Sequence, residues 1–322
     1  MKLNAKERKI LYELSKNARL SASKIAAKTG VSKDVAVYTI KKFLRNKTIK
    51  KLVTLIDTES LGFARYEVYF KLENIGKEKH KEMLDYLTKH PMFMWVRSSL
   101  GDWEIASEFY ARNVHEYEDI LREVRNNFSS NIKKMDSVAV TYEHCFPLKC
   151  IGYKEEELPI EKRALREIKI DNEDFKILKN LSINARTNVV DIAKGTKLSP
   201  DAVIYRIKNL IKKKVILGYR VTIDEKMLGL QKFKVLLKLK NVDDKTYAKL
   251  LEFLKLQKST QYIKRSVGVW DFSVTLLAKD IEELRNIIFD MKSELKEALD
   301  DYKILLLFEE YKNTYFPEGI AK

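Results

Sequence analysis

The most constraining feature of this sequence is that it repeats itself at a fixed offset of 167 residues. Asn17-Ala18-Arg19 returns as Asn184-Ala185-Arg186, and Gly101-Asp102-Trp103-Glu104 returns as Gly268-Val269-Trp270-Asp271. The register holds without a gap from residue 10 to residue 103 of the first copy. A register this long indicates two copies of one fold, each far longer than the roughly 20–50 residues of a solenoid repeat.

Composition limits the class of protein. The 322 residues are 45% hydrophobic, enough for roughly two to four compact domains. No run of about 18 apolar residues occurs and no apolar segment opens the chain, so we expect no membrane span, no membrane partner and no secretion. Cys145 and Cys150 lack metal-site spacing, which favours free thiols and a cytoplasmic location. Heavy use of Lys and Glu is compatible with a thermophilic or archaeal source.

The net charge of +16 is concentrated at matching places in the two copies. Residues 1–50 hold 14 Lys and Arg against 3 Asp and Glu, and residues 201–250 hold 13 against 5. Residues 101–150, by contrast, hold 6 against 9. Focused positive charge favours a polyanion such as nucleic acid as the partner, although a solvated lysine-rich surface has the same composition.

The beginning of each copy predicts two short helices before a turn. Asn4 and Glu7 form an approximate capping box for the first helix, and Asp171 with Asp174 take these roles in the second copy. The turn after the second helix contains a glycine, residue 30, in the first copy. Lys197 occupies the matching position in the second copy, so its turn is expected to be built differently.

The third helix of each copy has a buried apolar stripe and a polar, basic outer face. The stripes are Ala36, Ile40 and Phe43, and Val203, Ile207 and Leu210. This arrangement is a helix-turn-helix, whose third helix enters the DNA major groove while nearby Lys and Arg neutralise phosphates. The candidate DNA-binding residues are Ser32, Lys33, Asp34, Val37, Tyr38, Lys41 and Lys42, and Ser199, Asp201, Ile204, Tyr205, Arg206, Lys208 and Asn209.

For two pairs of outward-facing residues, the sequence leaves two interpretations of their role open. Tyr38 and Tyr205 either pack along the DNA backbone or are exposed tyrosines without a role. Val37 and Ile204 either touch thymine methyl groups or are covered by a neighbouring helix.

A β-branched stretch follows each third helix, at residues 49–56 and 216–223, and is expected to form a wing. With the Asn184-Ala185-Arg186 turn and the closing Ile223-Asp224 and Leu228-Gly229, the second copy resembles the winged helix-turn-helix of the leucine-responsive/asparagine-regulator (Lrp/AsnC) transcription factors. The first copy resembles it less closely, because Thr39 replaces an Arg of the third helix.

The remainder of each copy predicts the order strand, helix, strand, strand, helix, strand. The expected elements are 66–72, 78–89, 93–99, 104–110, 114–128 and 138–144, and 233–239, 246–255, 262–267, 272–277, 281–296 and 303–308. This βαββαβ order is ferredoxin-like and matches the amino-acid-sensing domain of the Lrp/AsnC family. The predicted fold class is α+β, with two winged helix-turn-helix domains alternating with two ferredoxin-like domains.

The expected boundaries divide the chain into five segments. They are a winged helix-turn-helix at 1–60, a sensing domain at 61–148, a charged linker at 149–169, a second winged helix-turn-helix at 170–228 and a second sensing domain at 229–322.

The family resemblance also implies an effector site. In relatives an amino acid binds near a Gly-x-Tyr-Asp-like turn at subunit interfaces. The functional hypothesis for this chain is that a carboxylate of the turn receives the α-ammonium and backbone N–H groups receive the α-carboxylate. The matching residues are Gly101, Asp102, Glu104, Gly268 and Asp271. The structural alternative is a hairpin glycine, a core tryptophan and a surface acid.

Other chemistries have little support in the sequence. The four histidines, 80, 90, 115 and 144, are not at metal-ligand spacing, and no phosphate loop or nucleophile elbow occurs. His144 lies beside Cys145 at a strand end, where a structural role is favoured. We therefore expect no metal, no cofactor and no catalytic residue.

The sequence predicts a DNA-binding transcriptional regulator with double-stranded DNA as its partner, an amino-acid effector, and two copies paired as an intramolecular pseudo-dimer. Further association of chains is left open. Unequal third helices predict an asymmetric pair of half-sites. One alternative is an enzyme, since proteins similar to this family decarboxylate sirohaem. Another is an architectural DNA binder, favoured by Thr39 and the lysine-rich first copy.

Overall fold

The computed structural model describes residues 3–151, 167–240 and 243–321, and the chain forms two compact units. Unit 1 consists of Met1–Phe63, Ala164–Leu228 and Thr314–Lys322, and unit 2 of Ala64–Arg163 and Gly229–Asn313. We call residues 3–151 the first half and residues 167–321 the second half. Each unit is built from both halves. Most of the expected linker, 152–166, lies outside the described residues, and the five-segment division remains a prediction.

Unit 1 contains two groups of three helices. They are α1 (Ala5–Lys16), α2 (Ala22–Thr29) and α3 (Lys33–Arg45), and α6 (Asn172–Ile183), α7 (Val189–Thr196) and α8 (Pro200–Lys212). The expected capping box is present, because the Glu7 amide donates to the Asn4 side chain and the Asn4 amide donates to Glu7. The predicted apolar stripes of α3 and α8 are buried, at most 7% exposed.

The turn between the second and third helices is built in the same way in both halves. Gly30 has φ 68° and Lys197 has φ 56°, so both residues are left-handed at the helix C-terminus. The expectation of a different turn in the second half is therefore wrong. Lys197 adopts a backbone conformation that a side chain disfavours, and its N–H still bonds to the Ala193 carbonyl, closing the helix as Gly30 does.

The two strands expected to be wings pair with each other. β1 (Ile49–Ile56) and β6 (Ile216–Ile223) form an antiparallel two-stranded sheet. Val53 pairs with Arg220, its own counterpart at the 167-residue offset, so the pairing is symmetric about that point. A single strand leaves its backbone groups unpaired, and here the counterpart strand satisfies them instead of a separate hairpin in each half.

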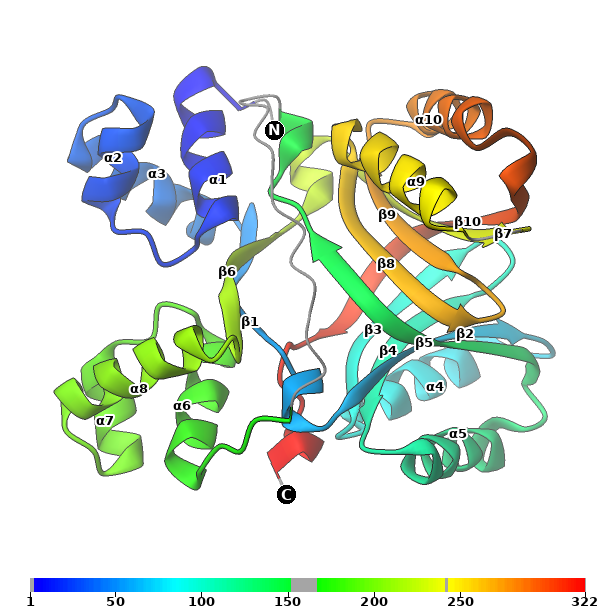
Figure 1. Ribbon diagram of the computed structural model, residues 1–322, viewed down its shortest axis with the longest axis horizontal. Helices are drawn as coiled ribbons and strands as arrows, with labels where there is room; N and C mark the ends of the chain where they lie inside the picture. The colour runs from blue at the N-terminus through cyan, green and yellow to red at the C-terminus, as the bar shows by residue number, and fades with distance from the viewer. Residues whose placement is uncertain (1–2, 152–166, 241–242, 322) are drawn as a thin grey trace. The chain divides into compact units, whose positions relative to one another are not determined.

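Unit 2 is a closed eight-stranded barrel with helices on its outside (Figure 1). The first half supplies β2 (Ala64–Leu72), α4 (Lys77–Lys89), β3 (Phe93–Leu100), β4 (Ile105–Ala111), α5 (Val114–Phe128) and β5 (Ile132–Cys145). The second half supplies β7 (Gln231–Leu239), α9 (Asp244–Leu256), β8 (Thr260–Gly268), β9 (Phe272–Ala278), α10 (Ile281–Leu295) and β10 (Leu299–Asn313). Short 3-10 turns occur at Glu59–Leu61, Lys149–Ile151, Glu225–Leu228, Lys296–Ala298 and Glu318–Ala321.

The two βαββαβ segments share one sheet. The strand order is β10-β3-β4-β2-β5-β8-β9-β7, and β7 pairs with β10 to close the barrel. Each half supplies four consecutive strands, and the halves join where β10 pairs with β3 and β5 pairs with β8. Neither half keeps an open sheet edge, because each edge strand pairs with the other half.

Both halves contribute to a buried apolar cluster in unit 2. Its members include Tyr69 and Trp103 from the first half and Leu236, Trp270 and Leu305 from the second. The rings of Trp103 and Trp270 meet edge to face, with centroids 5.9 Å apart. Across the described residues, no helix has the length and apolar character needed to cross a bilayer.

Candidate nucleic-acid interface

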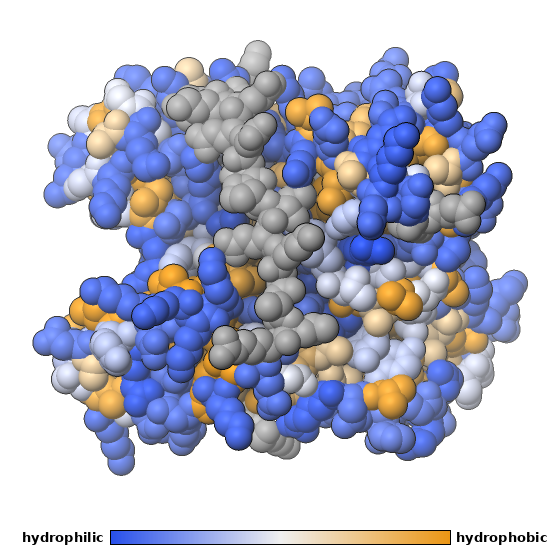
Figure 2. Space-filling view, in the orientation of Figure 1, coloured by the Kyte–Doolittle hydropathy of each residue, from blue (hydrophilic) through white to orange (hydrophobic). Residues whose placement is uncertain are grey.

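The exposed faces of α3 and α8 carry the residues predicted to contact DNA. Tyr38 is 64% exposed and Tyr205 is 70% exposed, so both rings point outward as expected. The other exposed residues of the set are Ser32, Lys33, Asp34, Lys41, Ser199, Asp201, Ile204 and Lys208, and those half-buried are Val37, Lys42, Arg206 and Asn209. Figure 2 shows scattered hydrophobic side chains among hydrophilic ones over α7 and α8.

Ser32 and Ser199 act as helix caps. Their hydroxyl oxygens accept hydrogen bonds from the amides of Val35 and Ala202. These bonds fix the first turn of each third helix, which is the part that meets base edges in a helix-turn-helix complex. The first-turn acids Asp34 and Asp201 complement the helix dipole at these ends.

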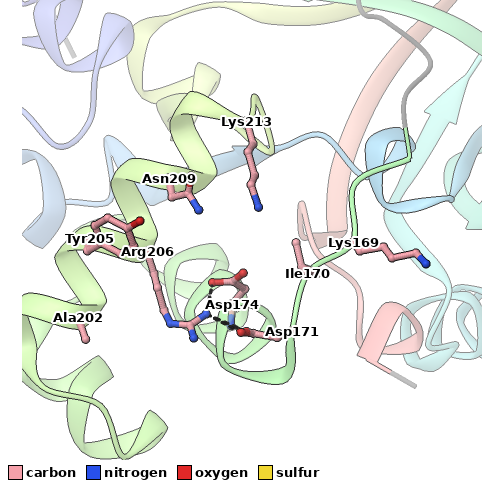
Figure 3. Close-up of a pocket in the computed structure, with 9 residues that line it drawn as sticks. All are labelled: Lys169, Ile170, Asp171, Asp174, Ala202, Tyr205, Arg206, Asn209 and Lys213. Atoms are coloured by element: carbon pink, nitrogen blue, oxygen red, sulfur yellow. Dashed lines mark hydrogen bonds and ion pairs between the residues drawn. The ribbon is translucent and has the colours of Figure 1, made fainter.

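Arg206 is bound within its own domain. Its guanidinium lies 2.7 Å from Asp171 and 2.8 Å from Asp174, and Figure 3 shows it extending from α8 to these two carboxylates at the start of α6. The Asp174 amide and the Arg206 guanidinium hold the pKa of Asp171 below its usual range. The two carboxylates raise the pKa of Arg206. Asp171 and Arg206 therefore both stay ionised at neutral pH.

The first half also has an ion pair between its third helix and its first helix, but from a different position of the third helix. Thr39, the counterpart of Arg206, is buried, and Lys42 one turn later lies 2.6 Å from Glu7 on α1. Burial would raise the pKa of Glu7, but the bonds from Lys42 and from the Asn4 amide lower it below the usual range. In each half, one cation of the third helix thus forms an ion pair with the first helix. The cation is Lys42 in the first half and Arg206 in the second, and these two positions differ by about one helical turn.

A shallow pocket lies beside the Arg206 ion pairs. Tyr205, Arg206 and Asn209 of α8 line one side, and Asp171 and Asp174 line the other (Figure 3). Because the pocket carries cations and acids together, it does not define a single ligand class. In the part of the chain that the structure describes, no group of three or more His, Cys, Asp or Glu is placed to hold a metal ion.

The Asn-Ala-Arg turns connect the two halves of unit 1. The Ala18 amide donates to the Tyr219 carbonyl of β6, and the Ala185 amide donates to the Leu52 carbonyl of β1. Arg186 donates to the carbonyls of Ala18 and Leu20, at 2.6 and 2.7 Å. The motif stood out in the sequence as a repeat, but nothing local to it indicated that it reaches the other half.

Arg19, the counterpart of Arg186, makes an equivalent hydrogen bond in the opposite direction, from the first half to the second. It donates to the Ala185 carbonyl at 2.8 Å, and its guanidinium lies over the Tyr219 ring. Burial and the nearby Arg19 lower the pKa of Arg186. The two arginines therefore hold the helix-turn-helix domains together by charged donors to backbone carbonyls, which are stronger than neutral hydrogen bonds.

The residues implied as an effector site lie in the β3–β4 and β8–β9 turns and have structural partners. Gly101 has φ 141°, and a Cβ there would lie 2.5 Å from the Ile304 carbonyl oxygen. Gly268 also has φ 141°, with 3.1 Å to the Ser137 carbonyl oxygen. Both glycines are required where the turn approaches a neighbouring strand.

The acids of these turns are also engaged. Glu104 accepts from the Leu72 amide, and Asp271 accepts from the Leu239 amide, at 2.7 and 2.8 Å. Asp102 is exposed and lies 3.4 Å from Lys303. The geometry thus gives the half-buried Glu104 and Asp271 a role in ending β2 and β7, and the effector role stays a prediction.

Known proteins similar to this chain share its helix-turn-helix segments. An AsnC-type helix-turn-helix domain model matches residues 170–211, and a winged helix-turn-helix DNA-binding model matches residues 3–50. The transcriptional regulator AzlB of Bacillus subtilis is 31% identical over 124 residues, which are 38% of this chain and 79% of AzlB. The HTH-type transcriptional regulator LrpA of Pyrococcus horikoshii is 34% identical over 122 residues, 37% of this chain and 83% of LrpA.

A solved structure resembles the whole chain. The siroheme decarboxylase NirDL matches with a TM-score of 0.64 at 15% identity, covering 99% of this chain and 96% of that one. At this identity the likeness is one of fold. The sequence relatives and the matched helix-turn-helix segments decide the family: the chain belongs to the Lrp/AsnC family.

Proposed function

We propose that this protein is a DNA-binding transcriptional regulator that reads duplex DNA with α3 and α8. The observation that carries the proposal is the pair of capped third helices with exposed outer faces. Tyr38 is exposed together with Lys33 and Lys41, and Tyr205 is exposed together with Lys208. The apolar stripe of each helix is buried against its own domain, so the polar face is free to enter a major groove. The regulators AzlB and LrpA, to which the chain is similar, support the same function.

The proposal includes a duplication that fused two Lrp/AsnC-like units into an intramolecular pseudo-dimer. Its support is the 167-residue register, the repeated element order, and the symmetric pairing of β1 with β6 around Val53 and Arg220. Because the two units are parts of one chain, their third helices can differ in sequence, which the identical subunits of a homodimer cannot. Lys42 and Asn209 are counterparts, as are Thr39 and Arg206, so the halves are expected to prefer different half-sites.

The experiment selects bound duplexes from a random library and then compares variants on the best duplex at one moderate salt concentration. Tyr205→Ala and Tyr38→Ala should each weaken binding roughly five-fold, equal to about 1 kcal/mol, through lost contact with the DNA backbone. Tyr311→Ala on β10, outside both helix-turn-helix domains, is the control. Unchanged affinity in both helix variants would contradict the assignment of α3 and α8 as readers.

An amino-acid effector at the β3–β4 and β8–β9 turns is the part of the proposal that rests on family resemblance. An α-ammonium would have to compete with the Leu72 and Leu239 amides for the carboxylates of Glu104 and Asp271. Thermal unfolding with each common amino acid at millimolar concentration tests it. A higher midpoint with one amino acid supports an effector, and no change with any removes it.

A second candidate is a sirohaem-modifying enzyme, favoured by the likeness of fold to NirDL over nearly the whole chain. Incubation of the purified protein with sirohaem distinguishes the two functions, because a bound tetrapyrrole changes the visible absorbance spectrum. A third candidate function is that of an architectural DNA binder. The library selection distinguishes it from a regulator, because an architectural binder would select no preferred sequence.

A further inference from the structure

A buried network of charged side chains crosses the barrel of unit 2. Glu67 on β2 and Glu108 on β4 come from the first half, and Lys234 on β7 and Lys264 on β8 come from the second. The Lys234 and Lys264 ammonium groups lie 2.6 and 3.0 Å from Glu67 Oε1. Lys264 also pairs with Glu108, and all four side chains are at most 6% exposed. We call these four residues the buried ion-pair cluster.

Neighbouring side chains of the first half complete the hydrogen bonds and ion pairs of the cluster. Tyr69 donates its hydroxyl to Glu67 Oε2 at 2.6 Å, and Lys264 lies 3.5 Å from Glu143, which Arg65 also binds. Burial would raise the pKa of Glu67, but the two lysines hold it well below its usual range. A buried charge that loses its partner is strongly destabilising, so each half depends on the other for its buried charges.

The contact between Glu67 and Lys234 joins counterparts, since the two positions differ by 167 residues. In a symmetric barrel of two first halves, Glu67 would therefore face a second Glu67. Arg97 would take the place of Lys264, and no lysine would stand in place of Lys234 to separate the two carboxylates. Two second halves would place Lys234 against Lys234, with Thr275 at the position where Glu108 supplies a carboxylate in the first half. Like charges in such a buried position repel strongly, because little water screens them.

We propose that the buried ion-pair cluster makes the barrel heterotypic, so that a first half accepts a second half as its partner and rejects another first half. This inference rests on the pairing of the halves within one chain, as proposed above. The two halves are unlike at two positions of the cluster, where Glu67 faces its counterpart Lys234 and where Glu108 has Thr275 as its counterpart. The counterpart of Lys264 is the buried cation Arg97, so the selection rests on the glutamate positions. In a cell that contains many copies of the chain, this complementarity prevents like halves of different chains from forming mixed barrels.

The test uses three variants of the full chain. An acidic variant carries Lys234→Glu and Lys264→Glu, so that both halves supply carboxylates. A basic variant carries Glu67→Lys and Glu108→Lys, so that both halves supply ammonium groups. A neutral control carries Glu67→Gln, Glu108→Gln, Lys234→Met and Lys264→Met, and it should fold because uncharged replacement of a whole buried cluster is tolerated.

Unfolding and mass in solution are the readouts, and neither requires DNA. Alone, the acidic and basic variants should lose the cooperative unfolding transition that the neutral control keeps. Co-expressed, they should form a one-to-one complex of two chains, because the first half of the acidic variant and the second half of the basic variant restore the natural cluster. This rescue would show that charge, and not side-chain size, selects the partner.

Two results would overturn the inference. Either charged variant could remain a monomer with the unfolding midpoint of the neutral control, or the co-expressed chains could fail to form a mixed complex. If the natural protein were itself a dimer whose barrels are shared between chains, the pairing within one chain would be contradicted. A natural monomer with an intact barrel that binds no DNA would contradict the proposed DNA-binding function alone.

Discussion

At the scale of single residues, Arg206 lies on the exposed helix α8 while two carboxylates of its own domain hold its guanidinium. Arg206 was predicted to contact DNA because the resemblance to Lrp/AsnC proteins implies an Arg at this position of the third helix. Its engagement with Asp171 and Asp174 could not be predicted from helix periodicity, which does not say which groups approach a side chain. The predicted stripes, by contrast, depend on periodicity alone and are buried as expected.

Replacing Asp171 by Asn separates its two roles. The Asn side chain can still accept the Asp174 amide and cap α6, but it no longer holds Arg206 by charge. We expect DNA affinity at low salt to rise by roughly two- to five-fold, about 0.4–1 kcal/mol. Fluorescence anisotropy with the selected duplex measures this change, and an affinity equal to that of the natural protein would contradict it.

Asp171→Ala is the matched variant, because it removes the cap as well. It should lower the free energy of unfolding by about 1 kcal/mol, whereas Asp171→Asn should leave the capping contribution in place. Since folding lowers the pKa of Asp171, its ionic contribution is present at neutral pH and disappears as the pH falls below the usual carboxyl range. Both variants should therefore lose that part of the acid sensitivity.

At the scale of elements, the sequence predicted the kind and order of every helix and strand quoted for the two halves. The boundaries agree closely where an apolar period or a cap marks them, as at α5, predicted and observed at 114–128. They differ most at β5 and β10, which are longer than predicted. The additional residues of β5, 132–137, pair with β2 of the same half. β10 extends at both ends: its first residues pair with β7 of the same half, and residues 310–313 pair with β3 of the other half. Pairing with a strand of the other half leaves no mark in the local pattern.

The Asn-Ala-Arg turns give a prediction at this scale. Arg186→Ala removes two charged hydrogen bonds to the other half and should lower the free energy of unfolding by about 2–3 kcal/mol. Arg19→Ala removes one such bond and should cost about half as much. Urea denaturation measures both changes.

Two further variants make that comparison specific. Arg186→Lys should recover little stability, because an ammonium group cannot reproduce the two-pronged donation to Ala18 and Leu20. Arg112→Ala, at an exposed pair with Glu116 in unit 2, should change the free energy of unfolding by less than about 0.5 kcal/mol. Equal effects of Arg186→Ala and Arg112→Ala would show that the turns do not hold the halves of unit 1 together.

At the scale of the whole molecule, both compact units are assembled from complementary, non-identical halves. In unit 1 the halves share a two-stranded sheet, and in unit 2 they share a barrel with a buried ion-pair cluster. The repeat in the sequence predicted two related halves, but it could not predict that Glu67 would meet its own counterpart. The ion pair between Glu67 and Lys234 depends on how β2 and β7, which are far apart in the sequence, pack in the barrel. This packing accounts for opposite charges at two equivalent positions.

The central claim is that the two unequal third helices bind duplex DNA, and the salt dependence of affinity tests it most directly. The account predicts that the logarithm of the affinity falls linearly with the logarithm of salt concentration, with a slope of about −4 or steeper, since each neutralised phosphate contributes about 0.9. Lys208→Ala should reduce the steepness by about one unit. A slope near zero would contradict the account.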